Sequence, residues 1–393
     1  MALTDENSVL ILGAGVSAPF GLPVGSRLID TIAENLNEQL ENYSLYAGDK
    51  GFSVSDFLPV KGYKIFSNYP YLEPLLWKAK DPDSELKDLV NDRDFEDGLY
   101  SELKIMEKLS GLLQNQTSDS IDDFIVMNEA YADHVKICIA AEFIKALYMR
   151  YFHTDYNLVG LDERSLSLPA GYKRPDGEIQ KNDERNWIHR LINLIRLGVI
   201  EGKVTPENKV RIITFNYDTI LEYVLEKQFL NTEYFEKLKK KKPDQKISYE
   251  DYIEIIHVHG QCGKLEKKLE IPSKTCWEWA QGIHVIRETS GRLNTDVAKN
   301  QRRIPILIKY AAEIYAAGFA FAKANTDLIG LAEGPPEEDR TIYYNNYSGD
   351  IGLRNAASKF EEMDPMYCQS QVIEEPKIGV SDWIGVGTLG ELP

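Results

Sequence analysis

Residues 8–23 read SVLILGAGVSAPFGLP, and the predicted fold depends on this stretch. The apolar run at 8–12 is typical of a buried central strand of a parallel sheet. Gly13 and Gly15 follow it and, because they lack a Cβ atom, let the backbone lie close against a phosphate. The helix start expected next offers unpaired N–H groups and a positive dipole end. A dinucleotide-binding fingerprint has a third glycine where this chain has Pro19, so a purely structural strand-to-helix turn remains the alternative.

The composition is that of a globular protein, with 393 residues, enough for one large domain with an insertion or for two domains. No apolar run is long enough to cross a bilayer, and the first residues lack the pattern of a secretory signal. The net charge of −17 speaks against broad nucleic-acid binding. The cysteines form no C-x-x-C pair, which argues against a zinc ribbon or a disulfide framework and predicts a cytoplasmic protein. They are Cys138, Cys262, Cys276 and Cys368.

Short apolar runs alternate with stretches of helical periodicity along most of the chain. This alternation predicts an α/β fold with a doubly wound, parallel, Rossmann-like sheet. The expected Rossmann-like domain comprises residues 1–35 and 205–355, interrupted by a mostly helical insertion at 36–204 and followed by an extended C-terminal tail at 356–393. Strands are expected at 8–12, 209–215, 253–258, 314–321 and 341–345. Connections with little regular structure are expected at 41–75 and 154–184.

Polar residues follow two further predicted strands. The motif TFNYD covers 214–218, and HVHG covers 257–260. Because loops at the carboxyl ends of parallel strands converge, these motifs and the glycine turn are expected to share one cleft. Asn216 offers a donor and acceptors that could hold a ribose hydroxyl or a water. Either Asn216 or Asp218 could instead cap the following helix; a role in the site is favoured for Asn216, and Asp218 is as well suited to capping as to binding a ligand.

His259 precedes a glycine at a strand end, where an imidazole can face a cleft and move a proton near neutral pH. His257 lies two residues earlier and shares its face if the strand extends that far. A structural role is the alternative for each histidine, and catalysis is favoured for His259 only. The pair could also bind a metal, but the sequence shows no third ligand, so no metal is expected.

Taken in order, G-A-G-V-S with G-L-P, T-F-N-Y-D and H-V-H-G resemble the motifs of the sirtuin-like fold, which read G-A-G-x-S with G-I-P, T-Q-N-x-D and L-H-G. Gly318-Phe319-Ala320 is similar to the glycine–Ser/Thr loop of that family, and Asn345 to its ribose-contacting asparagine. The resemblance covers roughly residues 8–35 and 205–350.

Two departures narrow the resemblance. Residues 24–26 read VGS where sirtuins have Asp-Phe-Arg, and the four-cysteine zinc module of sirtuin deacylases is missing. What remains resembles the bacterial sirtuin-like NADases of antiphage defence, which also carry I-D-D-F segments such as 121–124. The sequence YYNNYSGDIGL at 343–353 resembles that of members encoded beside a HerA-type ATPase.

The resemblance implies an enzyme that takes NAD⁺ as its substrate and releases nicotinamide and ADP-ribose. Asn216 would position the ribose or the attacking water, and His259 would act as general base. Asp123, within the I-D-D-F segment, could lie near the site. The residues expected around the dinucleotide are Gly13, Ala14, Gly15, Ser17, Gly21, Thr214, Asp218, Gly318, Phe319 and Asn345.

Control of such an activity by a homo-oligomer or by a partner, including a HerA-type ATPase, is also implied. The helical block and the tail after about residue 360 are the candidates for subunit contacts. Three other functions stay open: a module that senses NAD⁺ or ADP-ribose without cleaving it, a protein deacylase, and an interaction scaffold that uses only the helical part.

Overall fold

The computed structural model describes residues 7–23, 26–50, 70–79, 93–116, 120–152, 155–158, 187–284, 296–331, 339–346, 349–361, 370–376 and 379–385. The chain divides into two units, each described by itself. The first unit comprises Met1–Pro19, Glu163–Gly260 and Glu288–Pro393. The second comprises Phe20–Asp162 and Gln261–Arg287.

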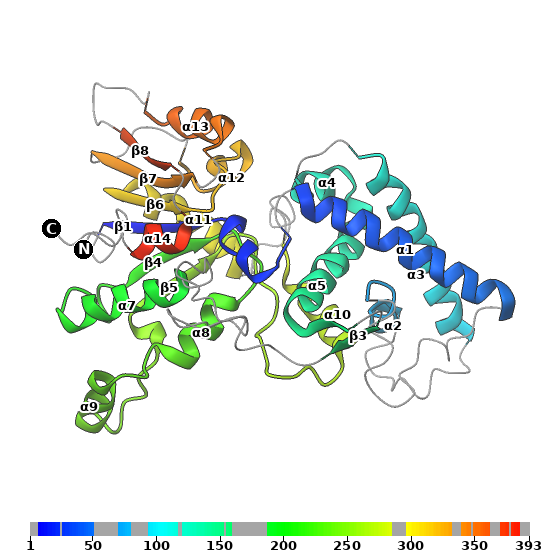
Figure 1. Cartoon of the computed structure of the whole chain (residues 1–393), viewed down its shortest axis with the longest axis horizontal. Helices are drawn as coiled ribbons and strands as arrows, with labels where there is room; N and C mark the ends of the chain where they lie inside the picture. The colour runs from blue at the N-terminus through cyan, green and yellow to red at the C-terminus, as the bar shows by residue number, and fades with distance from the viewer. Residues whose placement is uncertain are drawn as a thin grey trace. The chain divides into compact units, whose positions relative to one another are not determined.

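A parallel sheet of six strands forms the centre of the first unit (Figure 1). The strands lie in the order β5-β4-β1-β6-β7-β8, and every neighbouring pair is parallel. The unit therefore has a Rossmann-like α/β fold. The strands are β1 (Ser8–Leu12), β4 (Val210–Thr214), β5 (Ile253–His257), β6 (Glu313–Ala317), β7 (Arg340–Asn346) and β8 (Ser370–Pro376).

Both faces of this sheet are buried, which explains why its central strands are apolar along their whole length. Val9 and Ile11 share a core cluster with Ile304 and Ile308 of α11 (Asp296–Lys309). On the alternate positions, Leu10 pairs in register with Tyr315, whose ring lies 6.5 Å from that of Trp383. Trp383 belongs to α14 (Val380–Gly385). The remaining helices of the unit are α7 (Trp187–Ile200), α8 (Ile220–Gln228), α9 (Glu233–Lys241), α12 (Lys323–Leu328) and α13 (Ile351–Ser358).

The second unit is mostly helical, and its centre is α5 (Ala132–Tyr148). Nearly every α5 residue is buried, including the polar His134, Lys136 and Glu142, which places this helix at the centre of the unit. It packs against α10 (Pro272–Gly282), where the Sγ atom of Cys276 donates to the backbone oxygen of Ile137 at 3.4 Å. The other elements are α1 (Ser26–Lys50), α2 (Leu75–Ala79), α3 (Arg93–Gln114), α4 (Ile121–Met127) and the antiparallel strands β2 (Met149–Phe152) and β3 (Asp155–Leu158).

The five predicted strands are confirmed, and their ends differ from the predicted ones by at most a residue or two. The exception is β6, which was predicted to extend to residue 321 but ends at Ala317. The prediction of an extended tail is wrong over its described part, because β8 joins the sheet beside β7 and α14 packs against it. The prediction of an irregular connection at 41–75 is wrong at its start, since α1 continues to Lys50. Residues 51–69 and 159–184, and Cys368, lie outside the described residues.

The two units differ from the expected domains in two places. Helix α7 belongs to the first unit although it was expected within the helical insertion, and α10 belongs to the second unit although it follows β5 in the chain. Among the helices that the structure describes, none is long and apolar enough to cross a membrane.

Candidate functional site

The strand order locates a candidate site at one edge of the sheet. Counted along the chain, the six strands lie in the order 3-2-1-4-5-6, which is that of dinucleotide-binding sheets. In such sheets ligands bind beyond the carboxyl ends of the strands, where the order reverses. Here the reversal falls between β1 and β6. The loops after these two strands begin at Gly13 and Gly318.

The two loops touch through their backbones. The N–H of Gly13 donates to the carbonyl of Ala317 at 2.9 Å, and the N–H of Gly15 donates to that of Gly318 at 3.1 Å. A Cβ atom on Gly13 would lie 2.3 Å from the Gly318 oxygen, and one on Gly318 would lie 2.6 Å from the backbone nitrogen of Val16. Glycine is thus required here because the two loops approach each other so closely.

The contact between the two loops uses backbone N–H groups of the glycine turn that were expected to bind a phosphate. The turn continues as a 3₁₀-helix, Ala14–Val16, and not directly as an α-helix. Within residues 13–17, all of them described, only the N–H of Ala14 is not used in a backbone hydrogen bond, and Ala14 is exposed. The N–H groups that donate to backbone carbonyls are those of Gly13, Gly15, Val16 and Ser17.

A chain of hydrogen bonds connects this turn to the loop after β4. The Nδ2 atom of Asn216 donates to Oγ of Ser17 at 2.9 Å, and Oγ of Ser17 donates to Oδ2 of Asp218 at 2.6 Å. The other oxygen of Asp218 accepts the N–H of Ile220 at 3.2 Å, at the start of α8. Asp218 therefore binds the first N–H of α8 and also orients Ser17, although the N-cap residue itself is Thr219, which makes no side-chain capping bond. Burial raises the pKa of Asp218, and the Ser17 hydrogen bond opposes this rise.

These contacts hold Asn216 but leave one of its polar side-chain atoms without a hydrogen bond. Its N–H donates to Oγ1 of Thr214 at 3.1 Å, and its Nδ2 atom is used by Ser17. The Oδ1 atom of Asn216 is buried and has no hydrogen-bond partner among the described residues. A buried acceptor without a partner costs free energy, so it is a candidate for contact with a ligand.

His259 lies against the two residues that flank Asn216. Its ring centroid lies 5.5 Å from that of Phe215 and 6.1 Å from that of Tyr217. Its side chain is 2 % exposed, and within the described part of the chain neither ring nitrogen has a hydrogen-bond partner. Residues 216 and 259, predicted as the catalytic pair, thus belong to adjoining loops. Each contributes buried polar atoms without a partner.

His257, in contrast, is bonded at both ring nitrogens. Its Nδ1 atom lies 2.9 Å from the backbone oxygen of Asn216, and its Nε2 atom lies 2.5 Å from Oε1 of Glu222. Burial alone would lower the pKa of His257, but the hydrogen bond and charge of Glu222 more than offset this effect, so the pKa is raised. Glu222 was not among the predicted site residues. The feature of the sequence that could have indicated it is an acidic side chain in the first turn of the helix that follows the TFNYD loop.

Two of the residues predicted to lie around the dinucleotide have roles in the fold itself. The Oδ1 atom of Asn345 accepts the N–H of Gly318 at 3.0 Å and so fixes the start of the β6 loop. The Phe319 side chain lies in the core, with ring centroids 4.9 Å from Phe215 and 5.0 Å from Phe321.

Other predicted positions lie in the second unit. Gly21 belongs to that unit and has a φ of +85°, with open space where a Cβ would be. Asp123 is exposed on α4 of the same unit. Among the residues that the structure describes, no group of three or more His, Cys, Asp or Glu side chains is arranged to hold a metal ion.

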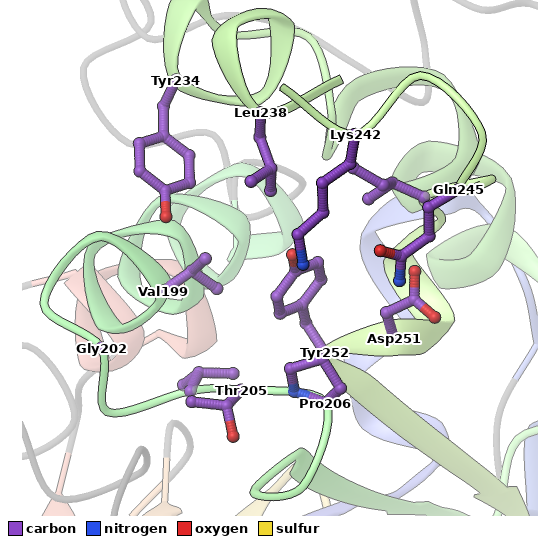
Figure 2. A pocket seen from close by; sticks show the side chains of 12 residues that line it. Val199, Gly202, Thr205, Pro206, Tyr234, Leu238, Lys242, Gln245, Asp251 and Tyr252 are labelled. Carbon is purple, nitrogen blue, oxygen red and sulfur yellow. The ribbon is translucent and has the colours of Figure 1, made fainter. Parts of the chain in front are cut away.

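A surface pocket of the first unit lies elsewhere (Figure 2). Its volume is about 230 Å³, and Lys242 points into it towards Tyr252. Its lining includes residues 204–206, which precede β4, and Ile247, Asp251 and Tyr252, which precede β5. The pocket is therefore at the amino ends of these strands, away from the edge where such sheets bind ligands, and it includes none of the predicted site residues.

The comparisons with known proteins add no relative. No protein-family model matches the chain, and no curated protein sequence matches it.

Proposed function

We propose that the first unit is a doubly wound, sirtuin-like domain that binds NAD⁺ and cleaves the bond between nicotinamide and ribose. The observation that carries the proposal is the pair formed by Asn216 and His259. Both present buried polar atoms that have no partner among the described residues, in the neighbouring loops after β4 and β5 at the carboxyl ends of the strands. A packed core does not retain such atoms without reason, because each leaves a desolvated polar group unsatisfied.

In the proposed reaction nicotinamide leaves C1′ of the ribose with the electron pair of the N-glycosidic bond. The Oδ1 atom of Asn216 accepts a hydrogen bond from the attacking water or from a ribose hydroxyl. The oxygen of water then forms the new bond to C1′, and a ring nitrogen of His259 takes its proton before passing it to solvent. The products are nicotinamide, ADP-ribose and one proton. Proton transfer of this kind contributes about 10²–10⁴-fold in rate.

The loop contacts support this assignment of roles. Ser17 binds the Nδ2 atom of Asn216, so the side-chain amide is held with Oδ1 as its available acceptor. The rings of Phe215 and Tyr217 lie against His259 and exclude water from it. A dry site strengthens the electrostatic interactions on which a developing oxocarbenium ion depends. The exposed Ala14 N–H is the turn's remaining donor for a pyrophosphate oxygen.

Incubation of the pure full-length protein with NAD⁺, with and without an acetylated peptide, tests the proposal. Nicotinamide release without peptide is the expected result. Release that depends on the peptide would identify a deacylase instead. Binding of NAD⁺ or ADP-ribose without release would identify a sensor, and absence of both binding and release would overturn NAD⁺ recognition itself.

The biological setting is also a proposal, and it is supported by the resemblance alone. We propose an effector of antiphage defence that depletes NAD⁺ in the cytoplasm and is controlled by self-association or by a HerA-type ATPase. Its mass and activity, measured with and without such an ATPase, test this control. Equal activity at every concentration and with or without the ATPase would contradict it.

A further inference from the structure

The loop that carries Asn216 is held by the ion pair of His257 and Glu222. His257 is the last residue of β5, and in the sheet it pairs in register with Thr214 of β4. Its ring bridges two elements: Nδ1 lies 2.9 Å from the backbone oxygen of Asn216, and Nε2 lies 2.5 Å from Oε1 of Glu222 on α8. The His257 side chain is 8 % exposed and that of Glu222 is 21 % exposed, so the contact to Asn216 is buried and the contact to Glu222 is partly buried.

The two partners determine the protonation state of this ring. A backbone carbonyl can only accept a hydrogen bond, and an ionised carboxylate can only accept one too. Both nitrogens of His257 must therefore donate, which only the imidazolium form can do. The raised pKa of His257 has the same cause, since the negative charge of Glu222 favours the cation.

The other charged groups near this ring act in the same direction. Asp218, in the loop before α8, also favours the cation. Glu222 in turn faces Tyr249, which precedes β5, and Glu226 lies near the same tyrosine. Among the described residues, the ring thus lies beside Glu222 and Asp218, and both favour its cation.

We propose that His257 is a positioning residue for the reaction at Asn216. As an imidazolium paired with Glu222, it binds the Asn216 carbonyl and so holds the backbone from which the Asn216 side chain extends. This inference rests on the proposed function, because it assigns His257 a part in the reaction attributed to that site.

The geometry shows why this contact controls orientation. Residue 216 is held at three atoms: its N–H by Thr214, its Nδ2 by Ser17 and its carbonyl by His257. The first and third contacts hold the peptide groups before and after the Cα atom of residue 216, and the second holds the side-chain amide. Loss of the His257 contact would therefore let the Cα atom shift and carry Oδ1 with it. A misplacement of about 1 Å can cost about 10²-fold in rate.

The experiment uses the full-length chain labelled with ¹⁵N at histidine, and the His257 signals are assigned with the His257→Gln variant. In the wild type we expect both ring nitrogens to be protonated at pH 7, and Glu222→Gln should lower the pH at which the ring titrates. A neutral ring at pH 7, or a titration that Glu222→Gln leaves unchanged, would overturn the proposal.

Nicotinamide release gives the second measurement. His257→Gln should lower kcat by about 10²-fold and change KM little, because a misplaced group weakens the transition state more than ground-state binding. Glu222→Gln should shift the alkaline limb of the kcat–pH profile to lower pH. Glu226→Gln, an equal loss of charge at an exposed position of α8, is the matched control and should leave the profile in place.

The two proposals fail in different ways. A wild-type protein that releases no nicotinamide would overturn the proposed function, and the positioning role with it, even where the NMR signals show the cation. A wild type that releases nicotinamide, with unchanged kcat and pH profile in both the His257→Gln and Glu222→Gln variants, would overturn only the positioning role.

Discussion

The side chain of Asn216 donates a hydrogen bond to the hydroxyl of Ser17, 199 positions away in the sequence, at 2.9 Å. This bond joins the loop after β4 to the turn after β1. The Ser17 hydroxyl in turn donates a hydrogen bond to Asp218, so three side chains from two loops form one hydrogen-bonded unit. The orientation of the proposed catalytic amide is therefore set by the glycine turn as well as by its own loop.

Ser17→Ala tests this unit. The substitution removes the donor to a buried carboxylate and the acceptor for the Asn216 amide, so we expect the free energy of unfolding to fall by about 1–3 kcal/mol. We also expect a lower kcat for nicotinamide release, because Asn216 loses its anchor. Urea unfolding and initial rates measure the two effects. Ser358→Ala, which removes a hydroxyl that donates to Asn355 of the same helix, is the control. Equal stability and rate in both variants would contradict the role of Ser17.

Gly318→Ala tests the contact between the two glycine loops. Gly318 has a φ of +59°, and a Cβ there would lie 2.6 Å from the backbone nitrogen of Val16. Gly202 has a φ of +74° but open space around it, which makes Gly202→Ala the matched control. The backbone penalty of about 1–2 kcal/mol is common to both variants, so the clash appears as the difference between them. We expect Gly318→Ala to be the less stable variant in urea. Equal losses would show that the loops can separate without cost.

The apolar runs at β1 and β4 were sufficient to predict these strands, because a strand buried along nearly all of its length leaves a continuous signal in the sequence. Strand β8 gives no such signal. It pairs only with β7, and its side chains from Gln371 to Glu375 are exposed or half-buried. The carboxylate of its Glu374 accepts hydrogen bonds from Asn346 and Arg354, which lie outside the β8 segment. An edge strand of this composition is recognisable only from its tertiary partners.

The candidate site, like the sheet, was predicted from the sequence only in part. The strand-end motifs predicted that Asn216 and His259 lie in adjoining loops, because parallel strands bring their carboxyl ends together. The bond between His257 and Glu222 could not be predicted, since it depends on how α8 turns back over β5. The glycines were predicted from their spacing, but the reason for Gly13 is the approach of Gly318, a residue far away in the sequence.

Trp383→Ala tests whether the end of the chain is part of the fold. Trp383 is fully buried and lies against Tyr315 of the sheet. Its removal should cost about 3–5 kcal/mol. Tyr310→Ala, at a residue that is 50 % exposed, should cost less than about 1 kcal/mol. Thermal and urea unfolding measure both. A Trp383→Ala protein as stable as the wild type would mean that α14 contributes no core.

Asn216→Ala and His259→Ala test the proposed catalytic pair. Each should abolish measurable nicotinamide release while the circular dichroism spectrum stays that of the wild type. For His259 some loss of stability is expected in addition, because its ring packs against Phe215 and Tyr217. His259→Gln fills more of that space and is the companion variant. Unchanged turnover in both Asn216→Ala and His259→Ala would remove these residues from the mechanism.

The pH dependence of stability tests the buried ion pair without any substrate. The pKa of His257 is raised in the folded protein, so its contribution is complete below the ordinary histidine pKa of about 6.5 and is lost as pH rises through the raised value. We therefore expect the free energy of unfolding of the wild type to exceed that of Glu222→Gln clearly near pH 6, and the difference to shrink above the raised pKa. Urea titrations of both proteins across this range measure it, with Glu226→Gln as the control for the lost charge. A difference between wild type and Glu222→Gln that is constant with pH would contradict a protonated His257 in the fold.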